Sequence, residues 1–147
     1  MIETLVKYAY QFVGLPYRWG GDDTIDGFDC SGLVQELYAS IGFDPPGDQT
    51  AQALYEHFKS VSHEKLLKPG ALAFYGKSED KITHVAMFID EKRIIEAGGG
   101  GSHTQTKEDA AIQNAYIRIR PYDRRKDLVA TLYPKELLSL SLSERQS

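Results

Sequence analysis

The hydrophobic pattern of this 147-residue chain changes from helical to strand-like at Lys68-Pro69-Gly70. Before that point apolar residues recur at helical spacing, and after it they form short runs separated by turn residues. Helices followed by strands are typical of an α+β fold. We therefore predict a single domain over residues 1–147, in which N-terminal helices pack on a mostly antiparallel sheet.

The predicted elements follow from this pattern and from the residues that interrupt it. Helices are expected at residues 2–13, 30–41 and 50–58, and strands at 71–75, 84–89, 93–95 and 116–120. Asp29 is a suitable N-cap for the second helix and Thr50 for the third. Asp90-Glu91-Lys92 is expected to form a short hairpin loop. From about residue 123 to 147 we expect a C-terminal extension, partly disordered, that ends in a short fraying helix.

The charge of the chain excludes one class of function. The formal net charge is −4 and the pI is about 5.5, whereas a protein that binds nucleic acid through phosphates carries a basic surface. The basic residues between Arg118 and Lys126 are mixed with acidic ones, so we interpret them as a solvated strand end and turn. We expect no nucleic-acid partner.

Two kinds of targeting segment are absent from the sequence. No run approaches the ~18 apolar residues of a membrane span, and the first residues lack the basic start and apolar middle of a signal peptide. We therefore expect a protein without a membrane span that is made in the cytoplasm.

Cys30 is the only cysteine of the chain. One cysteine cannot form an internal disulfide, and it argues against a zinc site built on cysteines. At the start of the second predicted helix, the helix dipole and unpaired backbone N–H groups favour the thiolate, which is the nucleophilic form. A lone cysteine on a helix is also commonly a small buried apolar residue, so its position alone leaves both interpretations open.

The sequence around Cys30 closely resembles the signature of the NlpC/P60 family. The resemblance is carried by residues 15–21 (LPYRWGG) and 28–34 (FDCSGLV), then by 67–75 (LKPGALAFY) and 84–89 (HVAMFI). These segments occur in the family's order, and the resemblance covers roughly residues 5–97. It implies a papain-like fold and the activity of a cell-wall cysteine peptidase.

The resemblance implies that Cys30 is the nucleophile and that His84 is its general base. A cysteine peptidase needs a base within hydrogen-bond reach of the sulfur, and His84 lies at the start of a predicted strand. The expected reaction is hydrolysis of an amide bond in peptidoglycan stem peptides, after γ-D-glutamate, through an acyl-enzyme on Cys30. Peptidoglycan or a muropeptide is then the partner of this site.

A third polar residue should hold the other imidazole nitrogen, and the family usually has a histidine there, twelve residues after the base. In this chain the residue is Glu96. With a three-residue hairpin loop, Ala86 faces Glu96 across the two strands, and both lie on the face that carries His84. The alternative is that Glu96 faces solvent beside the following glycines and that His103 or Asn114 orients His84.

The remaining predicted site residues lie close to Cys30 in the sequence. The resemblance implies that Tyr17 helps the backbone N–H of Cys30 to bind an oxyanion, although a tyrosine beside a core is commonly a structural partner. The resemblance also implies that Asp29 and Ser31 contact the free amino end of the substrate, and Asp29 also has its role as helix cap. Two loop residues are expected to line the substrate site as well, namely Arg18 and Trp19.

We expect no cofactor and no metal ion. Asp22-Asp23 has no further carboxylates at the spacing of a calcium loop, so we interpret this pair as a turn. The glycines at 98–101 lack the lysine and the serine or threonine of a phosphate-binding loop. We predict that they form a mobile rim of the site.

The sequence leaves two other functions open. The chain could be a papain-like amidase or acyltransferase on another substrate, or a catalytically inactive phage-tail or wall-binding module. Without a recognisable export signal, a wall enzyme would reach its substrate through phage lysis, a phage tail or an injected effector, or would act on muropeptides in the cytoplasm. Phage-tail or injection machinery is therefore also an expected partner.

Overall fold

The N-terminal half of the chain is helical in the computed structural model, which describes residues 1–23 and 27–140. The helices are α1 (Ile2–Tyr10), α2 (Cys30–Ala39) and α3 (Ala51–Phe58). Asp29 and Thr50 accept hydrogen bonds from backbone N–H groups of α2 and α3, so both predicted N-caps are confirmed. Helices α1 and α2 end earlier than predicted because their last turns tighten to three-residue spacing before Gly14 and Gly42, which have positive φ.

Six strands form the main sheet, and every neighbouring pair is antiparallel. In spatial order they are β3 (Ser62–Glu64), β8 (Leu128–Pro134), β4 (Leu72–Gly76), β5 (Ile82–Phe88), β6 (Arg93–Ala97) and β7 (Ile117–Pro121). A separate ribbon of β1 (Asp22–Asp23) and β2 (Gly27–Phe28) precedes α2. The predicted α+β class is confirmed.

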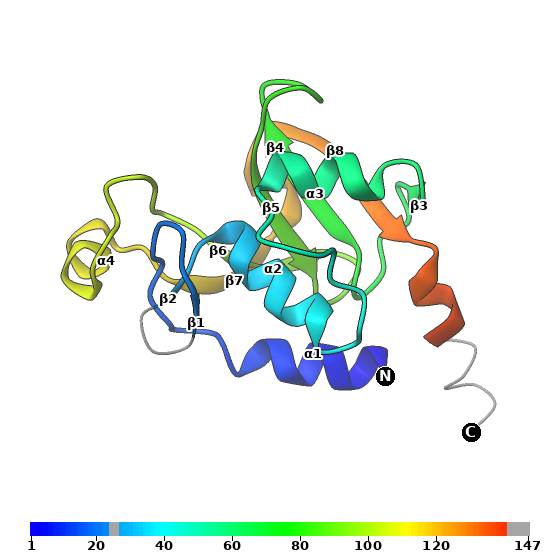
Figure 1. Cartoon of the computed structure of the whole chain (residues 1–147), viewed down its shortest axis with the longest axis horizontal. Helices are drawn as coiled ribbons and strands as arrows, with labels where there is room; N and C mark the ends of the chain where they lie inside the picture. Colours follow the sequence, from blue (N-terminus) through cyan, green and yellow to red (C-terminus); the bar gives the residue numbers. More distant parts are fainter. Residues whose placement is uncertain (24–26, 141–147) are drawn as a thin grey trace.

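Helices α2 and α3 both pack against β5, and Figure 1 shows them in front of the sheet with α1 crossing below α2. The core lies between these layers. Leu33 and Leu37 of α2, Leu54 of α3, and Phe74 and Met87 of the sheet are fully buried in one cluster. Burying each such side chain stabilises the fold by roughly 1.5–3 kcal/mol. This packing fixes the N-terminus of α2 relative to β5.

Strand β8 was not predicted from the sequence, and the prediction that residues 123–134 belong to a C-terminal extension is wrong. Every residue of β4 is buried, so its backbone N–H and C=O groups need partners along both edges. β5 supplies one edge and β8 the other. Residues 136–140 then form a helical segment, while the remainder of the predicted tail, 141–147, lies outside the described residues.

Two short elements, β3 and α4 (Lys107–Gln113), were also not predicted. Helix α4 begins with a capping box in which Thr106 and Asp109 bond to each other's backbone N–H groups. Figure 1 shows α4 at one end of the molecule, beyond β6 and β7. None of the helices in the described ranges is long and apolar enough to span a membrane.

The hairpin between β5 and β6 has the predicted register. Met87 pairs with Ile95 and Phe88 with Ile94, and the backbone N–H of Ile89 donates to Arg93. Residues 90–92 therefore form a three-residue loop.

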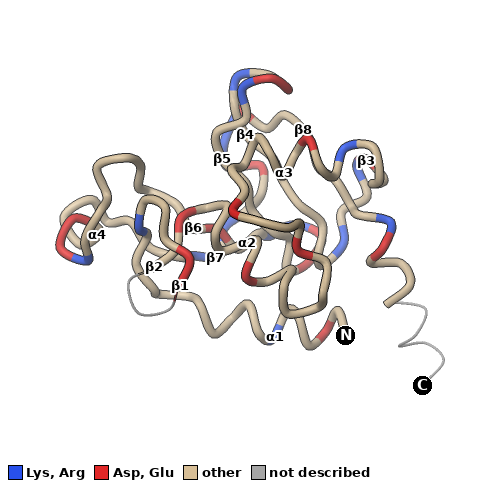
Figure 2. The backbone as a smooth tube through the Cα atoms, viewed as in Figure 1, with Lys and Arg blue, Asp and Glu red and all other residues tan. Residues whose placement is uncertain are grey.

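Acidic and basic residues are interspersed along the backbone (Figure 2).

Candidate active site

Cys30 is the first residue of α2 and is partly exposed. Asp29 organises the turn before it, because Oδ1 accepts from the backbone N–H of Gly32 at 2.7 Å and Oδ2 accepts from that of Gly20 at 3.0 Å. Ser31 Oγ donates to the same Oδ1 at 3.3 Å. Burial raises the pKa of Asp29, and these hydrogen bonds only partly offset that rise. The result is a fixed turn that presents Cys30 at the helix N-terminus.

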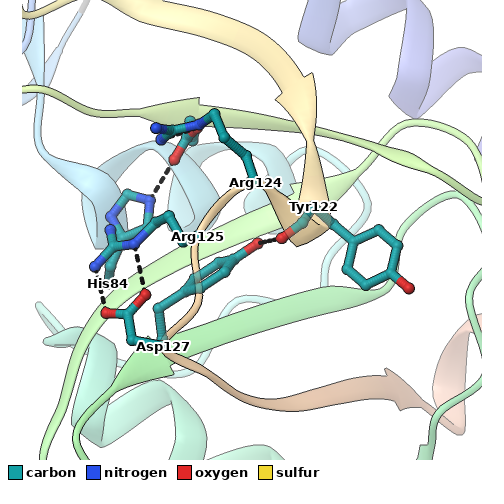
Figure 3. A network of polar contacts seen from close by, with 7 residues as sticks. His84, Tyr122, Arg124, Arg125 and Asp127 are labelled. Atoms are coloured by element: carbon teal, nitrogen blue, oxygen red, sulfur yellow. Dashed lines mark hydrogen bonds and ion pairs between the residues drawn. The ribbon is translucent and has the colours of Figure 1, made fainter.

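His84 of β5 and Glu96 of β6 form a buried pair. Their exposed fractions are 7% and 3%, and His84 Nε2 lies 2.6 Å from Glu96 Oε1, the contact that the dashed line from His84 marks in Figure 3. Nδ1 is then the nitrogen left for Cys30, which lines the same cavity as His84. The alternative in which Glu96 faces solvent and His103 or Asn114 orients His84 is wrong.

The charges of the site stabilise an imidazolium. Burial lowers the pKa of His84, but hydrogen bonds to Cys30 and Glu96 and the charges of both outweigh burial and raise the pKa to about 9. Burial likewise raises the pKa of Glu96, yet the hydrogen bond and charge of His84, followed by the charges of Arg124 and Arg120, bring it below its ordinary value. Near neutral pH the pair is therefore an ion pair.

Tyr17 is buried beside the nucleophile. Burial raises the pKa of its phenol, and the charges of Cys30 and Asp29 raise it further, so the hydroxyl keeps its proton. The ring also packs against the backbone of Gly100, where an added Cβ would lie only 2.3 Å from Tyr17 Cδ1. Tyr17 thus has a structural contact as well as a place beside Cys30.

A cavity of about 650 Å³ joins these groups. Seven of the eight predicted site residues line it, namely Tyr17, Trp19, Asp29, Cys30, Ser31, His84 and Glu96. Arg18, although described, is not among the lining residues. Trp19 lies at the rim with 55% of its surface exposed.

The glycines at 98–101 also line the cavity, as predicted for a rim. The backbone N–H of Gly101 donates to Thr104 Oγ1 at 3.0 Å, and Thr104 is fully buried. This contact attaches the glycine segment to the turn before α4. Its mobility stays a prediction.

Several residues that line the cavity were not predicted from the sequence. Asp48, Gln49 and Thr50 come from the segment before α3, and Arg124 and Arg125 come from the turn after β7. The basic residues up to Lys126 were predicted to be a solvated strand end and turn; the turn is present and Arg124 is exposed on it, but Arg124 and Arg125 also line the cavity. The signal that could have found them is Glu96, because a buried carboxylate needs compensating positive charge.

Asp22 and Asp23 are exposed residues of β1 and do not form the predicted turn. Within residues 1–23 and 27–140, no three His, Cys, Asp or Glu side chains gather in a way that could hold a metal ion.

A sequence profile of the NlpC/P60 family matches residues 14–121. The chain belongs to the NlpC/P60 family. It is 39% identical over 101 residues to the bifunctional muramidase/DL-endopeptidase CwlT of Bacillus subtilis, a match that covers 67% of this chain and 30% of CwlT. It is 30% identical to a γ-D-glutamyl-L-lysine dipeptidyl-peptidase of the same organism, over 94% of this chain and 40% of that protein.

Solved structures of the NlpC/P60 family share the fold. An NlpC/P60 family protein from Bacillus cereus superimposes with a TM-score of 0.67 at 23% identity, over 89% of this chain and 39% of that one. The chain therefore spans well under half the length of these relatives.

Proposed function

We propose that this NlpC/P60 domain is a cysteine endopeptidase that hydrolyses an amide bond of peptidoglycan stem peptides, on the carboxyl side of γ-D-glutamate. The observation that carries the proposal is the sequence of contacts from Cys30 through His84 to Glu96 along a cavity of about 650 Å³. The names of the two Bacillus subtilis relatives support the substrate class and the bond.

Acylation of Cys30 follows from this arrangement. In the resting site the thiol proton already resides on His84 Nδ1 as a thiolate–imidazolium pair, and the thiolate attacks the carbonyl carbon of the γ-D-glutamyl amide. The backbone N–H of Cys30 and the protonated Tyr17 hydroxyl stabilise the tetrahedral oxyanion. The imidazolium then donates its proton to the departing amine, the C–N bond breaks, and a thioester remains on Cys30.

Hydrolysis of the thioester reverses these roles. His84 removes a proton from water, the resulting hydroxide adds to the thioester carbonyl, and the thiolate leaves. Glu96 keeps Nε2 protonated and stabilises the positive ring in both halves of the reaction. Asp29 and Ser31, which flank Cys30 in the sequence and line the same cavity, receive the free amino end of the stem peptide.

The test uses defined peptides and mass spectrometry of the products. We expect L-Ala-γ-D-Glu-L-Lys-D-Ala to yield L-Ala-D-Glu and L-Lys-D-Ala, whereas the matched peptide with an α-linked L-Glu should stay intact. Cleavage at a different bond would overturn the bond assignment. No cleavage of either peptide, or of purified sacculi, together with failure of iodoacetamide to label Cys30 near neutral pH, would favour an inactive binding module.

A further inference from the structure

The buried carboxylate of Glu96 has one oxygen that the His84 pair does not use. Oε1 faces His84 Nε2, while Oε2 is buried and has no hydrogen-bond partner among the described residues. A carboxylate with an unsatisfied buried oxygen tends to take up a proton or to rotate away from its partner. Either change would remove the charge that supports the imidazolium of His84.

Arg124 supplies a positive charge at this oxygen. Its Nη2 lies 3.6 Å from Glu96 Oε2, an ion-pair distance that is too long for a hydrogen bond. The Arg124 side chain is 45% exposed and lines the cavity, so it closes the solvent side of a carboxylate that is otherwise buried. Figure 3 shows Arg124 on the far side of the contact from His84.

The neighbouring arginines have other partners. Arg125 donates two hydrogen bonds to Asp127, at 2.9 and 2.6 Å, and stacks over the ring of Tyr75 at 5.0 Å. Arg118 of β7 lies opposite Glu96 of β6 in the sheet, but the Arg118 guanidinium donates to Asn114. Arg124 is thus the arginine of this group whose ion pair is with Glu96.

The backbone that carries Arg124 is anchored on both sides. The 3-10 turn Tyr122–Arg124 follows β7, and the carbonyl of Tyr122 accepts a 2.6 Å hydrogen bond from the Tyr75 hydroxyl (Figure 3). The Arg125–Asp127 pair holds the next residues before β8. These contacts give Arg124 a defined position although its side chain is partly exposed.

We propose that Arg124 is a positioning residue, which keeps Glu96 ionised and oriented so that Oε1 faces His84. The proposal rests on the role proposed above for the Cys30–His84 pair. Charged and titratable groups from five parts of the fold interact with the Glu96–His84 pair. These groups are Cys30, Tyr75, Arg120, Arg124, Arg125 and Asp127.

Removing the charge of Arg124 should change the pKa of Glu96 in a predictable direction. The charge of Arg124 lowers the pKa of Glu96, so Arg124→Gln should raise it, and the ionised form of Glu96 should then be lost at a higher pH as the solution is acidified. Activity should fall on the acidic side of the profile, and little should change on the alkaline side.

The experiment measures kcat/KM for the γ-D-glutamyl peptide from pH 5 to 9 in Arg124→Gln and Arg124→Lys. The matched control is Lys126→Gln, which removes the same charge from an exposed residue two positions away. We expect Arg124→Gln to lose about fivefold at pH 5.5 and less than twofold at pH 8. Arg124→Lys should recover most of the loss, and Lys126→Gln should behave as the wild type.

A double-variant comparison separates positioning from direct substrate binding. In a Glu96→Gln background, Arg124→Gln should have no further effect on the acidic limb, because the carboxylate on which Arg124 acts is gone. An equal loss in both backgrounds, or a loss that is the same at every pH, would overturn the proposal and would instead indicate that Arg124 binds the substrate.

The same variants are compared by the rate at which iodoacetamide alkylates Cys30 as a function of pH. This measurement needs no substrate, so it tests the proposal for Arg124 even if no stem peptide is cleaved. We expect the acidic limb of the alkylation rate to move to higher pH in Arg124→Gln and to stay in place in Lys126→Gln. Coincident limbs in the wild type and Arg124→Gln would contradict the role of Arg124.

Discussion

At the scale of single residues, the site is a series of hydrogen bonds and ion pairs, and each residue positions the side chain of its neighbour. Asp29 holds the turn at Cys30, His84 lies between Cys30 and Glu96, and Arg124 faces the free oxygen of Glu96. Glu96 determines the charge state of His84, because a carboxylate 2.6 Å from the ring nitrogen favours the imidazolium over the neutral ring.

The first prediction concerns this carboxylate. His84 has a pKa raised to about 9, so its charged form is present below that pH and is lost as the pH rises through it. The alkaline limb of kcat/KM should therefore fall near pH 9 in the wild type. Glu96→Gln keeps a hydrogen-bond acceptor but removes the charge, and it should move this limb to lower pH. The exposed His57 gives a control variant, His57→Gln, which should leave the limb in place.

A second prediction separates the two roles of Asp29. Asp29→Asn keeps an oxygen that can accept from Gly32, so the helix cap should survive, whereas the negative charge is lost. We expect KM to rise about tenfold for stem peptides with a free amino end. Peptides that are acetylated at that end should be cleaved equally by the variant and the wild type.

The corresponding control removes the cap itself. Asp29→Ala should lower the free energy of unfolding by about 1 kcal/mol, measured by denaturant melts. If Asp29→Asn still discriminates between free and acetylated peptides as well as the wild type does, Asp29 is a helix cap only.

At the scale of elements, the cavity is built where three connections meet. The N-terminus of α2 brings Cys30, the β5–β6 hairpin brings His84 and Glu96, and the turn between β7 and β8 brings Arg124. Helices α2 and α3 pack on β5, and this packing fixes the N-terminus of α2 relative to the β5–β6 hairpin. The glycine segment 98–101 completes the wall beside Tyr17.

The third prediction tests that wall. Gly100→Ala would place a Cβ 2.3 Å from the ring of Tyr17, so the ring or the segment must shift. We expect a loss of about 1–3 kcal/mol in the free energy of unfolding and a lower kcat/KM, because Tyr17 moves away from the position that we propose for the oxyanion. Gly101→Ala is the matched control, since no atom lies within 4 Å of its added Cβ. Equal behaviour of the two variants would show that the contact with Tyr17 is unimportant.

At the scale of the whole molecule, local sequence patterns predict most of the helices and strands around the site. The caps at Asp29 and Thr50 and the three-residue loop after β5 are set by neighbouring residues, so they can be read from the sequence. The loop length also fixes the register that brings Glu96 to His84.

The features that were missed depend on contacts between distant segments. Strand β8 follows a charged stretch, and only the buried edge of β4 reveals where it belongs. Arg124 and Arg125 reach the cavity because β7 and β8 are far apart in the sheet order and their connection passes the site. No local pattern distinguishes these arginines from Lys126, which is exposed.

The central claim is that Cys30 carries out the chemistry. The most direct test compares the wild type with Cys30→Ala on the same γ-D-glutamyl peptide, after circular dichroism and thermal melts have shown that both are folded. We predict that the variant loses product release by about 10³-fold or more while its melting temperature changes little. Undiminished cleavage by folded Cys30→Ala would contradict the account.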